Sequence, residues 1–177
     1  QCAVALARVR MTAQLVKAEQ VRQELELARI VQTSALPRSL PVVPGYRMHA
    51  TFRPAAETGG DTYDLALIDG QLLVLLADAT GHGIAPAMSV AQMQAMLRMA
   101  MRLGAPLEQV FREANNQLAE TLPEGHFVTA FVGLLDPVAH RLRFISGGQG
   151  PILHYVAAAD AFTVHRPGSF PLGADRL

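Results

Sequence analysis

The chain has 177 residues, which is about the length of one domain and long enough to bury a substantial core. Its 15 Lys and Arg residues balance its 15 Asp and Glu residues, so charge gives no reason to expect binding to nucleic acid or to an anionic membrane. Half of the residues are hydrophobic, but the uninterrupted apolar runs are far shorter than the roughly 20 residues of a membrane span.

Cysteine content and the chain ends indicate where the protein works. The only cysteine, Cys2, excludes an internal disulfide framework and fits a reducing compartment. The N-terminus lacks an apolar core of the length that a signal peptide needs. Gln1 opens within a helical pattern, and Leu177 ends without a closing element. We therefore expect a cytoplasmic protein, or the cytoplasmic part of a larger one, from which this chain is an excised piece.

The first predicted element is a long helix over residues 1–34, which contain no Gly or Pro and many good helix formers. Apolar residues recur along one narrow seam with two polar interruptions, at Leu6, Val9, Ala13, Val16, Gln20, Gln23, Leu27 and Ile30. One interpretation is a parallel coiled coil that makes the protein a homodimer and carries a signal from an upstream sensor or receiver domain. The alternative is a helix packed on its own domain. We expect a linker at 1–36 and one domain at 37–177.

The rest of the chain predicts an α+β fold. Residues 46–53 alternate as a first strand does, and helical spacing recurs over 84–103 and from Pro106 to Pro123. Further strands are predicted at 127–136, 142–146, 152–156 and 162–165. Strands followed by a helix pair and more strands indicate antiparallel sheets, and a central hairpin that is apolar on both faces indicates layers of sheet and helix.

The central hairpin spans residues 59–83, with Asp69-Gly70 as its turn. A two-residue loop places Asp61 directly across from Asp78, with Cβ atoms roughly 4.5–5.5 Å apart. Like charges in direct opposition are destabilising unless a cation lies between them or one is protonated. The pattern predicts a divalent cation with oxygen ligands, Mg²⁺ or Mn²⁺. The alternative is a pair of helix caps or solvated strand ends.

At these residues the chain resembles a known family. GGDTYD at 59–64 and ADATGHG at 77–83 are similar to the signature of the PPM metal-dependent Ser/Thr phosphatases, in the bacterial branch typified by sporulation stage II protein E. Other segments that resemble the family follow in its order, namely VQTSALP at 31–37, FVTA at 127–130, GGQGP at 147–151 and PLG at 171–173.

The resemblance implies a four-layer α-β-β-α sandwich of antiparallel sheets with two Mn²⁺ or Mg²⁺ ions at one end. By position, Asp61 and Asp78 would be the catalytic metal-bridging residues, and the main-chain carbonyl of Ala79 would be a further ligand. Gly60 belongs to the same motif. Gln149 stands where the family usually has His.

Two neighbouring residues, Asp64 and His82, are expected to act without binding the metal directly. Asp64 follows Asp61 on the opposite face of the strand, so we interpret it as a structural or supporting residue. His82 lies between two glycines, where it either contacts phosphate or shapes the turn by hydrogen bonding.

The activity implied by the family is attack of metal-activated water on a phosphoserine or phosphothreonine, without a covalent enzyme intermediate. The substrate would be a small regulator of the anti-anti-sigma (STAS) type. The family takes further aspartate ligands from a later Asp-Gly strand and a C-terminal region, which have no counterpart in these residues. The alternative is therefore a degenerate or truncated phosphatase-like module that acts in protein–protein interaction. A nucleotide hydrolase is set aside because the chain has no GxxxxGK[ST] loop.

Overall fold

The computed structural model of the chain describes residues 2–54 and 58–176, with the side chains of residues 8, 10–54 and 58–176. In chain order the elements are α1 (Cys2–Ala35), β1 (Asp61–Ile68), β2 (Gln71–Ala79), α2 (Ile84–Arg102), α3 (Leu107–Thr121), β3 (Val128–Asp136), β4 (Arg141–Gly147), β5 (Ile152–Val156), a short 3-10 turn (Ala157–Ala159) and β6 (Ala161–His165). All strand pairs between these named strands are antiparallel. The prediction of an α+β fold with antiparallel sheets is confirmed.

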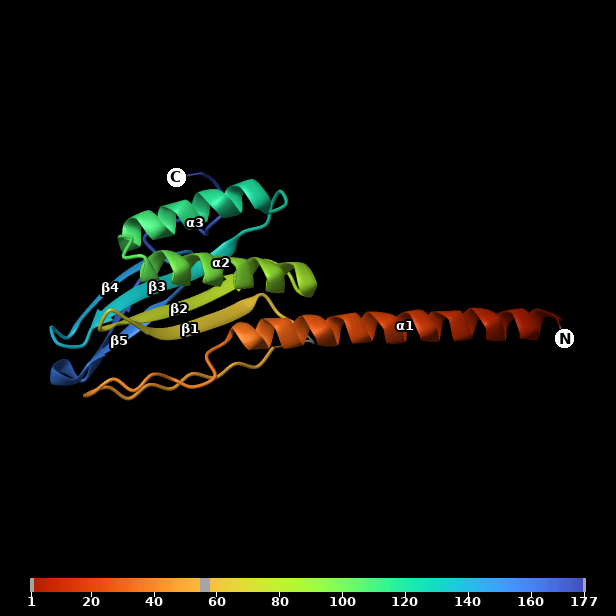
Figure 1. Ribbon diagram of the computed structural model, residues 1–177, viewed down its shortest axis with the longest axis horizontal. Helices are drawn as coiled ribbons and strands as arrows, with labels where there is room; N and C mark the ends of the chain where they lie inside the picture. Colours follow the sequence, from red (N-terminus) through yellow and green to blue (C-terminus); the bar gives the residue numbers. More distant parts are fainter. Residues whose placement is uncertain (1, 55–57, 177) are drawn as a thin grey trace.

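Strands β1 to β4 form one sheet in the order β1-β2-β3-β4, and helices α2 and α3 cover one of its faces (Figure 1). Apolar side chains at alternate strand positions meet the inner sides of the two helices, because successive strand residues point to opposite faces. The largest fully buried apolar side chains are Leu73, Leu75, Val90, Met93, Leu97, Leu118, Val128, Val132 and Leu172. This core fixes the sheet that carries the candidate site.

The hairpin between β1 and β2 has the predicted two-residue turn. Asp69 and Gly70 both have positive φ, at 48° and 79°, which the mirror-image turns of tight hairpins require. Ile68 therefore pairs with Gln71, and the register carries back along both strands until Asp61 pairs with Asp78. A slip of one residue would move every side chain of one strand to the other face, so this turn decides where the acidic residues point.

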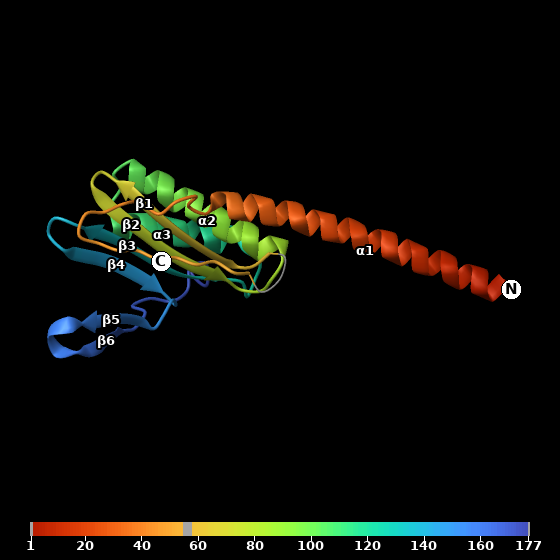
Figure 2. The same ribbon diagram turned by 90° about the horizontal axis from the view of Figure 1, so that it is seen from below.

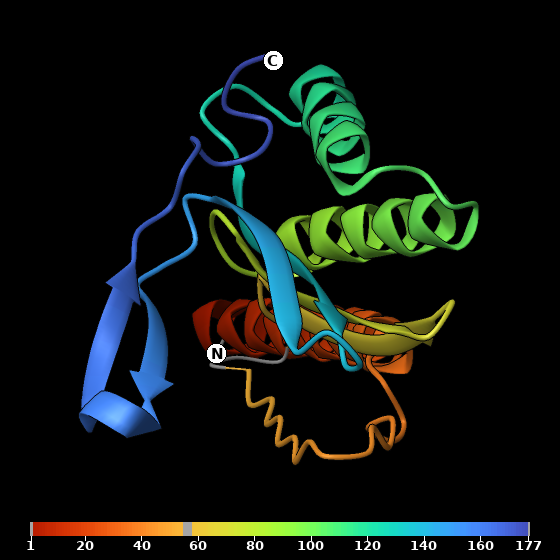
Figure 3. The same cartoon turned by 90° about the vertical axis from the view of Figure 1, so that its left-hand side faces the viewer.

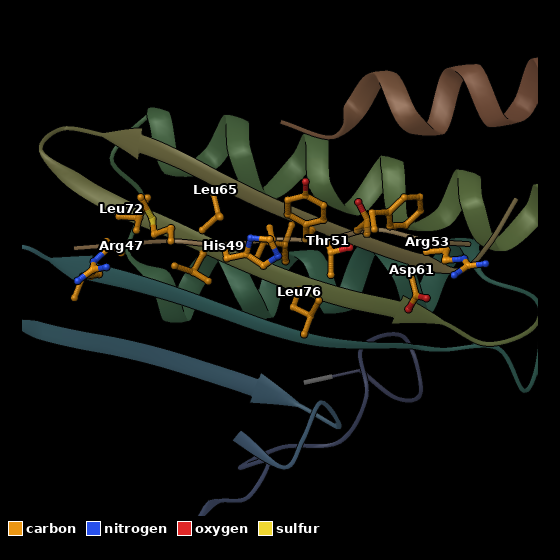
Figure 4. Close-up of a pocket in the computed structure, with 16 residues that line it drawn as sticks. Arg47, His49, Thr51, Arg53, Asp61, Leu65, Leu72 and Leu76 are labelled. Atoms are coloured by element: carbon orange, nitrogen blue, oxygen red, sulfur yellow. The ribbon is translucent and has the colours of Figure 1, made fainter. Parts of the chain in front are cut away.

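The second face of the sheet is covered differently from the prediction. Residues 46–53 run along this face without regular secondary structure (Figure 1) and pair with no described strand, so the predicted first strand is wrong. Alternation in this segment reflects exposure: odd-numbered positions from Arg47 to Arg53 are exposed, and even-numbered ones from Met48 to Phe52 are half-buried against the sheet. A groove of about 720 Å³ lies between this segment and the sheet (Figure 4).

Strands β5 and β6 make a separate two-stranded sheet. The end-on view shows this hairpin standing apart from the main sheet (Figure 3), and the view from below shows the same (Figure 2). The chain then returns to the main sheet, where Leu172 pairs with Val128 and is completely buried. Asn115 on α3 accepts a 3.0 Å hydrogen bond from the main-chain N–H of Gly173. The PLG motif thus serves to pack the C-terminal segment.

Helix α1 projects away from the sheet for most of its length, and only its C-terminal end lies beside α2 and β1 (Figure 1). Its predicted seam faces solvent where it is described: Val16 is 54% exposed, Leu27 64% and Ile30 56%. The side chains of Leu6 and Val9 lie outside the described residues. A helix packed along its own domain therefore does not account for this seam. Among the helices of the described part of the chain, none has the length and apolar character to cross a membrane.

Candidate metal centre

Asp61 and Asp78 stand opposite each other at one end of the β1–β2 hairpin, where both side chains are exposed. The pKa of the Asp78 carboxyl is raised above its ordinary value, first because partial burial disfavours the charged form and second because the charge of Asp61 lies nearby. The two carboxylates therefore repel each other across the strand pair. A cation between them would remove this repulsion.

Gly60 makes the close approach at this end of the hairpin possible. A Cβ atom added to Gly60 would lie 2.3 Å from the carbonyl oxygen of Ala79 and 2.9 Å from Oδ1 of Asp78. The Ala79 N–H donates a 3.0 Å hydrogen bond to the Gly60 carbonyl, which holds the two segments together. Any side chain at Gly60 would displace the Ala79 carbonyl and the Asp78 carboxylate, both of which are candidate ligands.

This donor set fits a hard divalent cation. Two carboxylates and one carbonyl supply only oxygen atoms, which Mg²⁺ and Mn²⁺ prefer. Mg²⁺ keeps several waters when proteins bind it, so three protein oxygens suffice for a partly hydrated ion. Within residues 2–54 and 58–176, no group of three or more His, Cys, Asp or Glu side chains could hold a metal. The described part of the chain therefore offers two acidic ligands.

The remaining residues of the hairpin motif have different surroundings. Asp64 lies on the opposite face of β1 and is completely buried, where Arg98 of α2 binds both of its oxygens. His82 is exposed in the turn between β2 and α2 and makes no hydrogen bond with another described residue. The turn is shaped by Gly81 and Gly83, with φ of 96° and 95°. The glycines therefore account for the turn without help from the imidazole.

The Gln149 side chain makes a hydrogen bond to the sheet next to the candidate site. Its Oε1 accepts a 2.8 Å hydrogen bond from the hydroxyl of Thr129 on β3. Thr129 pairs with Asp78 in the sheet register, and its hydroxyl lies 3.4 Å from the Asp78 carbonyl. Gln149 therefore supports the strand next to the candidate site from the side of β3.

Sequence reasoning missed two buried glutamines that hydrogen-bond from the helices to residues at the start of β1. Gln32 of α1 hydrogen-bonds to the main chain of Gly59 and Asp61, and Gln94 of α2 hydrogen-bonds to the Thr62 hydroxyl. Both glutamines are only 3% exposed. Gln94 could have been found, because it interrupts the buried apolar stripe of α2 and a buried polar group needs a partner. The apolar seam of α1 does not include Gln32, and the signal that points to it is the VQTSALP segment at 31–37, which resembles the family.

Two arginines lie on the groove wall. The groove is lined by Arg47 and Arg53 together with Asp61, and Arg53 lies at the same end of it as Asp61 (Figure 4). The alternation of residues 46–53 was visible in the sequence, but it gave no reason to place Arg53 near the acidic pair.

Comparison with known proteins identifies the family to which this chain belongs. The family described as stage II sporulation protein E (SpoIIE) matches residues 68–177, more than half of the chain. The chain therefore belongs to the SpoIIE family of PPM-type phosphatases, which confirms the resemblance. The match includes Asp78 and Ala79 but begins after Asp61. The inclusion of Asp61 in the candidate site therefore rests on the hairpin register, which pairs it with Asp78.

The chain is also similar to individual proteins. It is 26% identical over 170 residues to Protein IcfG of Synechocystis sp. (strain ATCC 27184 / PCC 6803 / Kazusa), covering 80% of this chain and 27% of IcfG. It is 22% identical over 144 residues to Phosphoserine phosphatase RsbU of Bacillus subtilis (strain 168), covering 81% of this chain and 43% of RsbU. This chain thus spans less than half the length of either relative.

A solved structure shares the fold. The SiaA-PP2C domain of Pseudomonas aeruginosa superimposes with a TM-score of 0.73 at 19% identity, covering 90% of this chain and 65% of that chain. At this identity the likeness shows the fold alone, and it places this chain among PP2C-type phosphatase folds.

Proposed function

We propose that this chain is the metal-dependent phosphatase domain of a bacterial signalling protein and that it removes phosphate from phosphoserine or phosphothreonine on another protein. The observation that carries the proposal is the direct pairing of Asp61 with Asp78 beside the Ala79 carbonyl. Membership of the SpoIIE family and the name of the relative RsbU, a phosphoserine phosphatase, support it.

In this proposal Asp61, Asp78 and the Ala79 carbonyl hold Mn²⁺ or Mg²⁺, with two ions in the complete site. Divalent cations there would supply a nucleophile near neutral pH by lowering the pKa of water, and would neutralise phosphate charge. Gly60 keeps the space between the two strands open. Arg53, at the same end of the groove as Asp61, adds positive charge that attracts a phosphate dianion.

The proposed partner is a phosphorylated regulator of the anti-anti-sigma (STAS) type, and the proposed setting is the cytoplasm. The chain would receive its signal from an upstream sensor or receiver domain. Helix α1 would form a homodimeric coiled coil over residues 1–34, with the domain at 37–177. The exposed apolar residues along the projecting helix, such as Leu27 and Ile30, support this assembly.

A second candidate function is a phosphatase-like module that binds a phosphorylated regulator without hydrolysing it. It is favoured by the donor set, because no third acidic side chain of the described residues completes the metal site. The two functions differ in whether phosphate is released in a metal-dependent way.

The test is Mn²⁺-dependent release of phosphate, measured with a phosphoserine peptide in this chain and in the natural full-length protein. We expect Asp61→Asn and Asp78→Asn each to lower the rate by more than about a hundredfold, because each removes a direct ligand. The control is Asp69→Asn, the same change at the other end of the same hairpin, where Asn-Gly forms an equally favourable turn. Metal-dependent turnover by the full-length protein that survives both site changes would contradict the proposal.

A further inference from the structure

Gln32 is a buried polar residue in the last turns of a largely exposed helix. Its side-chain amide donates hydrogen bonds of 2.6 Å to the Gly59 carbonyl and 3.1 Å to the Asp61 carbonyl. Its Oε1 accepts a 3.3 Å hydrogen bond from the Gly59 N–H. A glutamine amide has two donors and one acceptor oxygen, and here all of them are used by two residues at the start of β1, Gly59 and Asp61.

The arrangement follows from the position of β1 at the edge of the sheet. Backbone carbonyls of a strand point alternately to either side. The Gly60 carbonyl points to β2, where it accepts a hydrogen bond from Ala79 N–H, and the Gly59 and Asp61 carbonyls point away from the sheet. These outward carbonyls have no neighbouring strand, and Gln32 provides the donors that such a strand would supply.

The segment that Gln32 holds has little rigidity of its own. Gly59 and Gly60 have no side chains to restrict their backbone, so this stretch gains conformational freedom once its external bonds are lost. Asp61 follows immediately and is the first residue of β1. The direction of its carboxylate toward Asp78 therefore depends on how the two glycines are held.

A second set of hydrogen bonds, made by Gln94, holds the C-terminal end of α1 in place. Gln94 of α2 donates a 2.8 Å hydrogen bond to the Ala35 carbonyl and accepts a 2.9 Å hydrogen bond from the Thr62 hydroxyl. The last turn of α1 is thus fastened to both α2 and β1. Gln94 anchors the helix, whereas Gln32 contacts the backbone of the site itself.

We propose that Gln32 is a positioning residue of the metal centre: by bonding to both outward carbonyls it sets the Gly59–Asp61 backbone in the geometry in which Asp61 and Asp78 share a divalent cation. This inference rests on the proposed function, in which that pair binds Mn²⁺ or Mg²⁺. The affinity of the site for the cation thus depends on a side chain of α1 that does not touch the metal.

The experiment titrates MnCl₂ into the chain by calorimetry and compares the wild type with Gln32→Met, which keeps the length of the side chain and removes its hydrogen bonds. We expect the dissociation constant for Mn²⁺ to rise roughly tenfold, because the three hydrogen bonds that hold the Gly59–Asp61 backbone are lost. The matched control is Gln14→Met, the same change at an exposed position of α1 outside the seam, which is expected to bind Mn²⁺ as the wild type does.

Two further measurements separate positioning from general destabilisation. Hydrogen exchange of the Gly59 amide is expected to accelerate in Gln32→Met, because this amide loses its acceptor. Gln94→Met is expected to lower the melting temperature while leaving the Mn²⁺ dissociation constant within about twofold of the wild type. Where the full-length protein shows turnover, saturating Mn²⁺ is expected to restore the rate of Gln32→Met, which loss of folded protein would not allow.

The outcomes distinguish this inference from the function on which it rests. Wild-type chain that binds Mn²⁺ no better than Asp61→Asn would overturn the proposed function and this role together. Wild-type chain that binds Mn²⁺ while Asp61→Asn does not, with Gln32→Met binding as tightly as the wild type, would overturn the positioning role and leave the proposed function standing.

Discussion

Arg98 of α2 binds both carboxylate oxygens of Asp64 on β1, and its Nε lies 2.7 Å from Oδ2. Asp64 is completely buried, whereas the Arg98 side chain is 32% exposed. A buried carboxylate is tolerated only when it is paired and hydrogen-bonded, and this bidentate contact meets that need. Three residues earlier on the same strand, Asp61 points to the other face and has solvent around it. The charge of Asp64 is therefore compensated inside the protein by Arg98, whereas the charge of Asp61 is exposed opposite that of Asp78.

The first prediction concerns Asp64. Arg98→Leu leaves the Asp64 charge buried without its partner and is expected to lower the free energy of unfolding by about 3 kcal/mol. The double variant Asp64→Leu/Arg98→Leu removes both charges and is expected to recover most of that loss, because apolar replacement of a buried pair is often neutral. Urea unfolding followed by circular dichroism measures both. A double variant as unstable as Arg98→Leu would show that the pair itself stabilises the fold.

The second prediction concerns pH. The pKa of Asp78 is raised in the folded protein, so the folded state holds this proton more tightly than the unfolded chain does. In the metal-free protein, protonation of Asp78 therefore stabilises the folded state over the unfolded chain. This stabilisation is fully present below pH 3.8, the ordinary pKa of the group, and is lost as the pH rises through the raised pKa. The Asp78→Asn variant has no titrating group at this position, so it does not lose this contribution. We therefore expect the free energy of unfolding of Asp78→Asn, minus that of the wild type, to increase from acid toward neutral pH and then to stay constant.

Urea unfolding over a pH series in the presence of a chelator measures this difference, with Asp69→Asn as the control for a change of one carboxylate. Saturating Mn²⁺ is expected to reverse the trend for the wild type, because protons and cations compete for Asp78. A constant difference between Asp78→Asn and the wild type at every pH would contradict the raised pKa.

The third prediction concerns Gln149. Gln149→Leu removes the acceptor of the Thr129 hydroxyl and is expected to lower the free energy of unfolding by about 1 kcal/mol. Because the Gln149 side chain hydrogen-bonds to Thr129 and to neither aspartate, the rate of phosphate release per folded molecule is expected to stay within about twofold. A large loss of that rate with unchanged stability would assign Gln149 to the chemistry instead.

The acidic pair could be predicted because one local signal determined it. Asp69-Gly70 sets the turn, the turn sets the register, and the register places Asp61 against Asp78. The α2 and α3 helices were likewise found by local periodicity, and their predicted ends lie within one or two residues of the observed ones. These features depend on residues that are close in sequence or in strict alternation.

What supports the pair could not be predicted, because it joins distant segments. Gln32 reaches Gly59 across 27 positions, and Arg98 reaches Asp64 across 34. No periodicity reports such side-chain contacts. Residues 46–53 show the converse error: their alternation predicts strand pairing, but it reflects only which side chains lie against the sheet.

The last prediction tests the close approach at Gly60. Gly60→Ala places a Cβ atom 2.3 Å from the Ala79 carbonyl oxygen, a contact that real structures do not contain, so the strands must separate there. Separation strains the hairpin by about 1–3 kcal/mol and displaces the Asp78 carboxylate, whose Oδ1 would lie 2.9 Å from the new atom. We therefore expect lower stability together with weaker Mn²⁺ binding.

Gly59 provides the matched control, since a Cβ added there meets no atom of the described residues closer than 3.8 Å and its φ is not positive. Gly59→Ala is expected to be neutral or to stabilise the protein by up to about 1 kcal/mol, because alanine restricts the unfolded chain. Thermal unfolding and Mn²⁺ calorimetry of the two variants form a direct comparison of adjacent positions. Equal Mn²⁺ affinity in Gly60→Ala and Gly59→Ala would mean that the Ala79 carbonyl and Asp78 carboxylate do not form the cation site.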